Sequence, residues 1–329
     1  MKYILGIDTS CYTTSMAGVD LNGNIIFSFQ KQLDVPLGER GLKQSTALFH
    51  HLNNLPILTN TLRSLASCHE IAAVCASDRP RPIEGSYMPV FQFSYRIGQS
   101  ISDLLRVPFF KVSHQENHIM AGRYTARGPN SDQFLTFHLS GGTSELLYVS
   151  SKPSGFEVEI IGGTTDLSAG QFVDRIGVAM GLPFPAGPHL EKMASSGSGD
   201  IMLNGSVKGT KISFSGPESQ GQRLICQNMS YNEIAYAVYD LLVRTISKCI
   251  LNAVKSGYPN EVLLVGGVSS SKILKIGLQE RIKRHNRNIQ LYFADPELSK
   301  DNAVGTALLG LKAYRINSFG MEEKDVYTD

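Results

Sequence analysis

The chain has 329 residues, enough for one large or two medium domains, and its 42% hydrophobic and 18% charged residues are ordinary for a globular protein. A net charge of +2 neither requires nor excludes a nucleic-acid partner. The five cysteines are odd in number and show no CxxC spacing. They argue against a disulfide framework and indicate a reducing compartment, so we expect a cytoplasmic protein. Neither a signal-peptide pattern nor a long apolar run predicts contact with a membrane.

The start of the chain predicts a meander of three strands. Apolar runs at 3–7, 16–20 and 25–29 are the expected strands. The small-residue stretch 8–15 separates the first two, and Leu21–Asn24 separates the last two. The Asn-Gly pair in the second connection suits a tight hairpin loop.

The same plan recurs in the middle of the chain. Strands are expected at 134–139, 146–150 and 156–161, with a hydroxyl-rich turn, 140–144, between the first two. Two such meanders, each followed by helices, are typical of the duplicated actin-like ATPase (ASKHA) fold. In that fold two hairpins hold the phosphates of ATP across a central cleft. Likeness at the level of the fold does not determine function.

We therefore predict an α/β protein with two actin-like subdomains. The first covers residues 1–130 and is completed by a C-terminal helix, 303–329. The second covers 131–302 and carries the nucleotide site and most residues of a metal site.

Periodicity predicts the remaining elements. A helix over 45–67 has a leucine stripe that we expect to be buried, and Pro56 is expected to kink or break it. The stripe consists of Leu48, Leu52, Leu55, Leu58 and Leu62. Further helices are expected at 93–105, 115–124, 169–180, 231–255, 272–284 and 301–314, and strands at 70–77, 109–112, 261–265 and 289–294. Loops are expected at 78–85 and 181–188, and surface excursions at 196–200 and 205–216.

The stretch Ser140-Gly141-Gly142 is a candidate phosphate site. Glycine allows a ligand to approach the backbone closely, and successive N–H groups can form a nest for an anion. An ordinary tight hairpin turn explains the same residues.

His114 and His118 are a candidate metal pair. Residues four apart lie on one helical face, with Cβ atoms about 6 Å apart. Two imidazole nitrogens can then meet one metal ion at about 2.0–2.1 Å. Two unrelated surface histidines are the alternative. The absence of an HExxH sequence gives no support to a zincin protease.

Three further features have ordinary explanations when taken singly. Gly266-Gly267 can contact a nucleotide or form a plain strand-to-helix turn. Asp301 can be a ligand or the N-cap of the last helix. Asp174 and Glu191 lie near glycine-rich turns and can be solvated charges or caps.

Together these stretches resemble, in order and over nearly the full length, the TsaD family of tRNA threonylcarbamoyladenosine synthases. The matching segments are Leu5–Cys11 (family LGIETSC), His114–His118 (HxxxH), Ser140–Ser144 (SGGxT), Ala169–Asp174 (AGEAFD), Leu182–Pro188 (LxYPGGP), Ser213–Gly216 (FSFSG), Gly266–Ser269 (GGVSAN) and Asp301-Asn302 (TDN).

The resemblance implies a reaction and a set of cofactors. The family passes a threonylcarbamoyl group from threonylcarbamoyl-adenylate to N6 of the adenosine beside the tRNA anticodon. It implies one divalent metal ion, iron or zinc, held by His114, His118 and Asp301. ATP or the adenylate is expected to contact Ser140, Gly141, Gly142, Asp174, Gly187, Glu191, Gly266, Gly267 and Ser271.

The resemblance also implies catalytic residues and partners. We expect Asp8, Ser10 and Asp174 to take part in catalysis. Expected partners are an adenine nucleotide, tRNA, and either proteins similar to TsaB and TsaE or a second copy of the chain.

The sequence departs from the family pattern in its N-terminal half. The acidic pair that usually follows the opening cysteine is replaced by Tyr12 and Thr13. Segments 43–49 and 79–82 replace the family's PELASR and GPGL stretches. Thr143 replaces a histidine, and Ser271 replaces an asparagine that contacts the nucleotide.

These departures leave two alternatives to the transferase. One is a non-catalytic paralogue that binds nucleotide and acts as a scaffold for another protein. The other is a kinase or carbamoyltransferase of the same fold that acts on a small molecule. No peptidase constellation is present.

His138 is a further candidate metal ligand. It precedes Ser140 by two residues, at a position where bacterial members of the family usually have an aliphatic residue and archaeal and eukaryotic members have a metal-reaching tyrosine. We predict that it joins His114, His118 and Asp301. A histidine packed into the core is the alternative.

Overall fold

The computed structural model of the chain describes residues 2–10, 12–34, 42–65, 70–298 and 301–319. Expectations that concern Cys11, residues 66–67 and residues 320–329 lie outside the described residues.

The chain divides into two compact units. Unit 1 comprises residues 1–124, 151–157 and 300–329, and unit 2 comprises residues 125–150 and 158–299.

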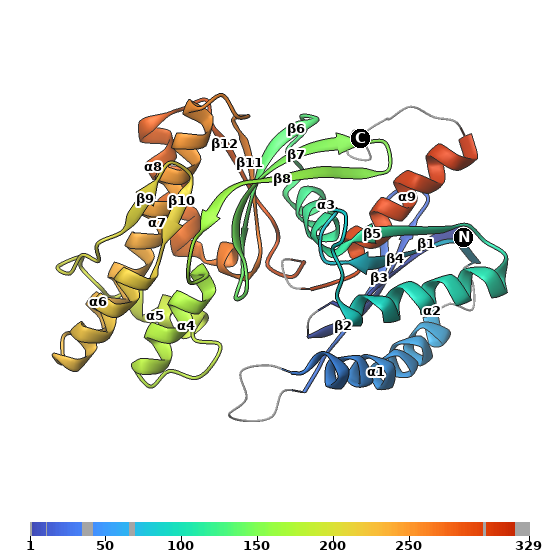
Figure 1. Cartoon of the computed structure of the whole chain (residues 1–329), viewed down its shortest axis with the longest axis horizontal. Helices are drawn as coiled ribbons and strands as arrows, with labels where there is room; N and C mark the ends of the chain where they lie inside the picture. The colour runs from blue at the N-terminus through green and yellow to red at the C-terminus, as the bar shows by residue number, and fades with distance from the viewer. Residues whose placement is uncertain (1, 11, 35–41, 66–69, 299–300, 320–329) are drawn as a thin grey trace. The chain divides into compact units, whose positions relative to one another are not determined.

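Unit 1 contains a five-stranded sheet in the order β3-β2-β1-β4-β5 (Figure 1). Its strands are β1 (Lys2–Asp8), β2 (Thr13–Asp20), β3 (Ile25–Gln32), β4 (Glu70–Arg79) and β5 (Phe109–Ser113). The first three strands form an antiparallel meander, and β4 and β5 run parallel to β1. The meander predicted at the start of the chain is confirmed.

Unit 2 repeats this topology. Its sheet has the order β12-β11-β6-β7-β8-β10-β9. The strands are β6 (Gln133–Leu139), β7 (Ser144–Lys152), β8 (Gly155–Thr164), β9 (Ser206–Lys208), β10 (Lys211–Ser213), β11 (Glu261–Val265) and β12 (Gln290–Phe293). From β8 to β12 the order 8-7-6-11-12 corresponds to 3-2-1-4-5 in unit 1. The predicted α/β fold with a duplicated actin-like architecture is therefore confirmed.

Helices follow the strands in both units. Unit 1 has α1 (Gln44–Leu65), α2 (Pro89–Leu105), most of α3 (His114–Ala126) and α9 (Val304–Phe319). Unit 2 has α4 (Ala169–Ala179), α5 (Gly187–Ala194), α6 (Ser215–Cys226), α7 (Tyr231–Lys255), α8 (Lys272–His285) and the short 3-10 helix η2 (Gly267–Ser270). None of the helices, as far as the chain is described, has the length and apolar character needed to cross a membrane.

Strand β1 is covered on both faces. Because side chains alternate along a strand, Tyr3, Leu5 and Ile7 share one face and pack in a core with residues of α1 and α2. Gly6 lies on the other face, where a Cβ atom would lie 2.5 Å from the carbonyl oxygen of Ala303 at the start of α9. Only glycine lets the C-terminal segment approach β1 so closely. This contact brings the segment around Ala303 close to β1, which ends at Asp8.

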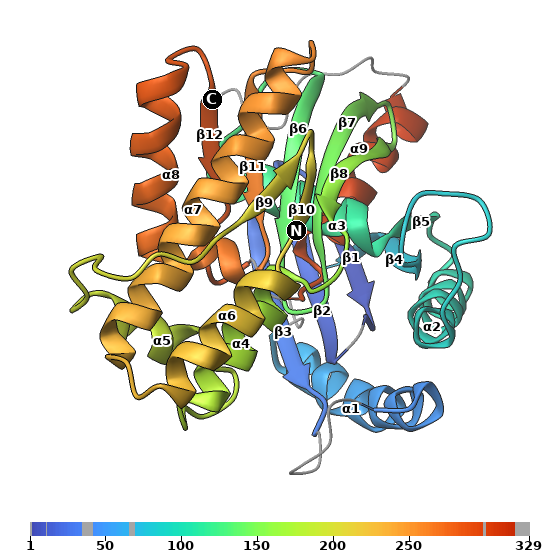
Figure 2. The ribbon, with the colours of Figure 1, turned by 60° about the vertical axis from the view of Figure 1, so that its left-hand side comes forward.

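The core of unit 2 is built around α7. This helix buries one long face in a cluster that includes Leu135, Phe137 and Leu146 of the sheet. Helix α8 packs beside α7, as the turned view shows (Figure 2). The predicted span of α7, 231–255, is confirmed.

The helix does not break at Pro56, because α1 is continuous through this residue. A kink there stays a prediction. Pro56 is exposed, and so is Leu52, whose carbonyl group loses its helical partner to the proline ring. On an exposed face water can solvate that carbonyl, so the helix tolerates the proline.

The predicted leucine stripe of α1 is only partly right. Leu55 and Leu58 are buried, but Leu52 is 52% exposed. The buried face instead includes His51, whose Nδ1 lies 2.8 Å from the hydroxyl of Thr14 on β2. The buried position that periodicity assigned to Leu52 is thus held by its neighbour His51, which makes a polar contact in the core.

Two predicted boundaries also need correction. The segment 205–216, expected as a surface excursion, contains β9, β10 and the start of α6, and although residues 205–211 are mostly exposed, it buries Ile212 and Phe214 completely or nearly so. Asp301 is not the N-cap of the last helix, since α9 begins at Val304 and its first amide donates to Oδ1 of Asn302.

Candidate functional site

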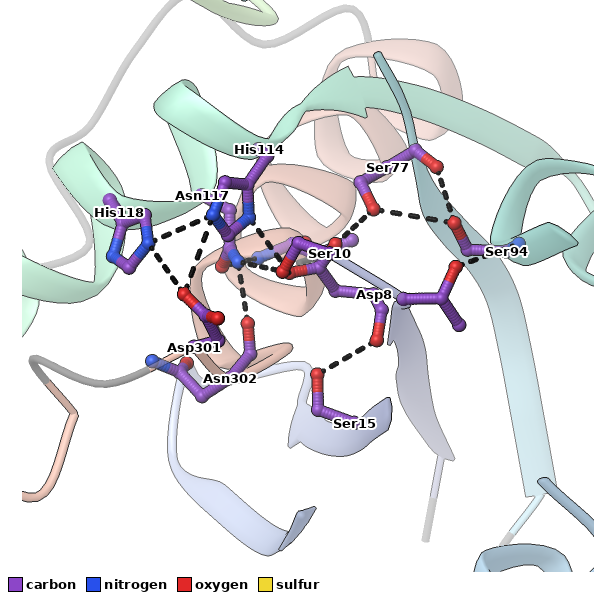
Figure 3. Close-up of polar contacts among 12 residues, drawn as sticks. Asp8, Ser10, Ser15, Ser77, Ser94, His114, Asn117, His118, Asp301 and Asn302 are labelled. Atoms are coloured by element: carbon purple, nitrogen blue, oxygen red, sulfur yellow. Dashed lines mark hydrogen bonds and ion pairs between the residues drawn. The ribbon is translucent and has the colours of Figure 1, made fainter. Parts of the chain in front are cut away.

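Three predicted metal ligands meet in unit 1. Helix α3 begins at His114, directly after β5, and carries both histidines on one face. Asp301 comes from the segment before α9 (Figure 3). Nε2 of His114 and Nε2 of His118 are 3.0 Å apart, and Oδ1 of Asp301 lies 3.5 Å and 3.2 Å from them. Among the described residues, these form the one group of three or more His, Cys, Asp and Glu ligands able to hold a metal ion.

The ligand distances fit a single metal ion. Ligands about 2.1 Å from a metal lie about 3.0 Å apart along an octahedral edge and about 3.4 Å apart along a tetrahedral edge. The three observed separations, 3.0, 3.2 and 3.5 Å, span these values. Two imidazoles and one carboxylate are also the donor set of open zinc and non-haem iron sites.

Asp8 lies behind His114 at the end of β1. Its side chain is completely buried, and Oδ2 lies 2.9 Å from Nδ1 of His114. This contact assigns the proton to Nδ1, which leaves Nε2 free to face His118 and Asp301. A carboxylate behind a ligating histidine fixes the ring and its tautomer.

Asp8 is surrounded by other donors, so both oxygens of its carboxylate accept hydrogen bonds. The hydroxyl of Ser10 donates to Oδ2 at 2.8 Å, and Nδ2 of Asn117 donates to the same oxygen at 3.2 Å. The hydroxyl of Ser77 donates to Oδ1. Figure 3 shows these side chains converging on Asp8. The two residues predicted as catalytic in this unit, Asp8 and Ser10, thus bond each other and lie completely buried.

The charges of the cluster favour a cation. Burial disfavours the charged form of His114, but the carboxylates of Asp8 and Asp301 outweigh it and raise the pKa of His114 to about 10. Burial also disfavours ionised Asp301, but hydrogen bonds from His114 and His118 hold the pKa of Asp301 well below its usual range. An environment that stabilises a proton on an imidazole also stabilises a metal cation at the same nitrogen.

Sequence reasoning missed the residues that connect these ligands. Asn117 bonds Asp8 and also donates to the carbonyl oxygen of Asn302 at 2.5 Å. Its Oδ1 accepts from the amide of Thr306 at 2.9 Å, and this contact joins α3 to α9. Asn117 lies inside the His114–His118 motif, which is the only local signal that could have indicated it.

In unit 2 the glycine turn lies between β6 and β7. The amide of Ser140 donates to the carbonyl of Thr143 at 2.8 Å, and the amide of Thr143 donates to the Ser140 hydroxyl at 3.0 Å. Gly141 and Gly142 are exposed, and a Cβ atom on either would meet no atom within 4 Å. The space on the Cβ side of these two residues is therefore open.

Helix α4 packs end-on against this turn. Its N-cap Ser168 donates from its hydroxyl to the carbonyl of Gly141 at 2.7 Å, and the Gly170 amide donates to the carbonyl of Ser140. A Cβ atom on Gly170 would lie 2.6 Å from Cα of Gly141. The start of α4 is thus fitted to the turn, and a helix N-terminus attracts anions.

The acids predicted to contact nucleotide already hold backbone groups. Oδ1 of Asp174 accepts from the amide of Ala186 at 2.8 Å, and burial raises the pKa of Asp174. Oε1 of Glu191 accepts from the Ser271 hydroxyl at 2.9 Å and from the Ile273 amide at 3.0 Å. Glu191 and Ser271 thereby share the cap of α8.

Buried Tyr239 of α7 is an additional residue that sequence reasoning missed. Its hydroxyl donates to the carbonyl of Gly187 at 3.0 Å. The structure therefore brings Gly187, Glu191 and Ser271 together around the ends of α5 and α8.

The second glycine pair splits into two roles. Gly266 has φ of 93°, and a Cβ atom there would lie 2.3 Å from the carbonyl oxygen of Leu139, so this residue serves close packing. Gly267 has no atom within 4 Å of the Cβ position and leaves its backbone accessible.

His138 belongs to unit 2 and is only partly buried on β6, where it pairs with Glu145 of β7 and Val265 of β11. The group of three ligands in unit 1 does not include it. The role of His138 as a metal ligand stays a prediction.

At the position of the family's acidic pair, Tyr12 is 42% exposed and Thr13 is buried.

Solved structures of other proteins share the fold of this chain. The fold is shared with component A of the (R)-2-hydroxyglutaryl-CoA dehydratase of Acidaminococcus fermentans, at a TM-score of 0.55 and 12% identity over 95% of this chain and 99% of the other. At that identity the likeness concerns the fold alone.

The family model of TsaD, tRNA N6-adenosine threonylcarbamoyltransferase, matches residues 28–308, and the chain belongs to this family. A tRNA N6-adenosine threonylcarbamoyltransferase of Archaeoglobus fulgidus is 28% identical over 94% of this chain and 91% of its own length. A "probable bifunctional tRNA threonylcarbamoyladenosine biosynthesis protein" of Methanocaldococcus jannaschii is 25% identical over 94% of this chain. The chain spans about half (55%) of that longer protein.

Proposed function

We propose that this protein transfers a threonylcarbamoyl group from threonylcarbamoyl-adenylate to N6 of the adenosine beside the tRNA anticodon. The amine nitrogen attacks the carbamoyl carbon, the bond from that carbon to the phosphate oxygen breaks, AMP leaves, and N6 loses a proton. Membership of the TsaD family supports this reaction type.

The single observation that carries the proposal is the group formed by His114, His118 and Asp301, whose atom separations fit one ion. Nitrogen and carboxylate donors suit iron and zinc about equally. When bound, the ion supplies Lewis-acid polarisation of an acyl or phosphate oxygen. Asp8 and Ser10 are proposed to act from behind His114, because neither is accessible to a substrate.

The adenylate is proposed to bind the turn of unit 2. The open backbone at Gly141, Gly142 and Gly267 offers N–H groups to phosphate oxygens, where negative charge grows as AMP leaves. Asp174 and Glu191 hold the first turns of α5 and α8 in place around Gly187 and Ser271. ATP is the proposed competing ligand at this site.

A reconstituted reaction tests the proposal. Metal-loaded protein is incubated with threonylcarbamoyl-adenylate and unmodified tRNA, and the digested tRNA is analysed for the modified nucleoside. We expect the product, and we expect His114→Ala to abolish it. No product, with an active TsaD enzyme run alongside, would contradict the transfer to tRNA.

The same preparation separates the alternatives. Binding of ATP and metal without turnover favours a scaffold that works with a TsaB- or TsaE-like protein or with a second copy. ATP consumption without any change in tRNA favours a small-molecule kinase or carbamoyltransferase. Failure of ATP to shift the melting temperature counts against every nucleotide-dependent version.

His138 as a fourth ligand has a direct test. We expect His138→Leu to lower the affinity for Zn²⁺ without loss of fold, because His138 is partly exposed. Unchanged metal content and affinity would show that His138 is not a ligand.

A further inference from the structure

Glu116 is a buried carboxylate inside the metal-binding motif that the proposed mechanism does not use. It lies on α3 between His114 and His118, and its residue is only 6% exposed. Two residues along a helix correspond to a rotation of about 200°, so Glu116 points away from both histidines. Burying a carboxylate is costly unless it is hydrogen-bonded, so its partners indicate what it does.

One partner of Glu116 is the start of its own helix. Oε2 of Glu116 accepts from the backbone amide of Ser113 at 2.8 Å and from the Ser113 hydroxyl at 2.7 Å. The amide of Glu116 lies 3.2 Å from the same hydroxyl. Ser113 and Glu116 therefore form a reciprocal capping box, and His114 is the first helical residue inside it. The box fixes the backbone that carries the first metal ligand.

The other partner lies far along the chain. Oε1 of Glu116 accepts from the amide of Phe156 at 3.1 Å. Phe156 is 4% exposed and belongs to residues 151–157, the tip of the β7–β8 hairpin, which clusters with unit 1. A Cβ atom on Gly155 would lie 2.4 Å from Oε1 of Glu116, so a side chain at this position would force the carboxylate or the tip to move.

A second contact holds the same tip. Nη1 of Arg123 donates to the Ser151 hydroxyl at 3.2 Å, and Arg123 is 3% exposed. Residues seven apart lie on one face of a helix, so Arg123 and Glu116 use the same side of α3. Helix α3 therefore presents His114 and His118 on one face and binds the hairpin tip with the other.

We propose that Glu116 is a positioning residue for the metal site, and that it aligns His114 and His118 by locking the first turn of α3 to the tip formed by residues 151–157. This inference rests on the proposed metal site. Glutamate is required because both of its oxygens accept hydrogen bonds from N–H or O–H groups. A glutamine would direct its NH₂ group at the amide of Ser113 or at that of Phe156.

The test compares Glu116→Gln with a matched control, Glu261→Gln. Glu261 in unit 2 is also a carboxylate that holds backbone, since it accepts from the Ser131 amide at 3.1 Å and the Tyr292 hydroxyl at 2.7 Å. The affinity of the full chain for Zn²⁺ is measured by competition with a chromophoric chelator, below the unfolding temperature of each variant. We expect Glu116→Gln to weaken Zn²⁺ binding about 10–100-fold, the usual loss for a group behind a metal ligand. Glu261→Gln should leave it within about twofold.

Gly155→Ala tests the same contact from the side of the tip, without a substitution in α3. The added methyl group would meet Oε1 of Glu116, so either the carboxylate or the tip must move and the hydrogen bond to the Phe156 amide is disturbed. We therefore expect a weaker Zn²⁺ affinity here too, and this variant decides the matter if Glu116→Gln does not fold. Wild-type affinity in both variants, or an equal loss in Glu261→Gln, would overturn the inference. A loss in Glu116→Gln alone would overturn the part assigned to the tip. Absence of Zn²⁺ binding by the unmodified chain would instead overturn the metal site itself, and this inference with it.

Discussion

The candidate residues of unit 1 and those of unit 2 are built in different ways. In unit 1, side chains from three distant segments converge, and a buried network of hydrogen bonds around Asp8 holds them before any ligand binds. In unit 2, the proposed ligand contacts are the exposed glycines Gly141 and Gly142, while the acidic side chains nearby already hold helix ends. A site made of side chains depends on their hydrogen-bond partners, whereas a site made of backbone depends on the space around it. Substitutions in unit 1 should therefore mainly lower Zn²⁺ affinity, whereas substitutions at the turn of unit 2 should mainly lower ATP binding.

The largest effect is expected from removing a metal ligand. His118→Ala should reduce the affinity for Zn²⁺ more than about 100-fold, beyond the loss typical of a residue behind a ligand, and should abolish transfer. Zn²⁺ competition and the nucleoside assay measure the two effects. His285→Ala removes an exposed histidine at the end of α8 and should change neither. Retention of Zn²⁺ binding by His118→Ala would remove this residue from the site.

The next effect concerns the network behind the ligands. Asp8→Asn replaces a carboxylate that accepts from Ser10, His114 and Asn117 with an amide that also donates. We expect the free energy of unfolding to fall by about 3–5 kcal/mol, because buried donors lose a charged partner. Zn²⁺ affinity should fall about 10–100-fold. Denaturant unfolding and Zn²⁺ competition measure the two quantities.

Asp20→Asn is the control for Asp8. Asp20 is another buried carboxylate of unit 1, and it accepts from the amides of Asn22 and Asn24 in the turn after β2. The Asp20→Asn variant should be less stable than the unmodified protein but should keep the same Zn²⁺ affinity. If Asp8→Asn behaves in the same way, Asp8 has no role toward the metal.

Features of the site that depend on residues close together in sequence could be predicted, and those that depend on distant residues could not. The spacing of His114 and His118 and the glycines of the turn are local signals, so they could be interpreted without coordinates. The bond between Ser77 and Asp8 joins residues far apart in sequence and has no local signature. The capping box of Ser113 and Glu116 is local and was missed because the histidines between them suggested another purpose.

The fold shows the same limit. Meanders and the amphipathic α7 have strong periodicity and were predicted correctly. Residues 205–216 have none. Strand β10 in this segment pairs in parallel with β8, and Phe214, directly after β10, is buried with its ring stacked on Phe172. Tertiary pairing decided the structure there, which no local pattern could indicate.

A steric change should affect unit 2 alone. Gly170→Ala adds a methyl group 2.6 Å from Cα of Gly141, where backbone must move. We expect the free energy of unfolding to fall by about 1–3 kcal/mol, as for other overpacked sites. The stabilisation of the protein by ATP should also be lost, while Zn²⁺ affinity stays at the wild-type value. A matching loss of Zn²⁺ affinity would show that the two sets of residues are not independent.

The smallest effect on stability is expected from Gly142→Ala, which sharpens the comparison most. The added Cβ meets no atom within 4 Å and the backbone is not in the left-handed region, so the free energy of unfolding should change by less than about 0.5 kcal/mol. If ligand phosphates approach this backbone, the same methyl group should weaken ATP binding by about tenfold or more, which corresponds to about 1.4 kcal/mol. Thermal unfolding with and without ATP measures both quantities on one sample. Wild-type ATP affinity in this variant would mean that the open turn is only a hairpin, because a phosphate seated on its amides could not ignore a methyl group at the point of approach.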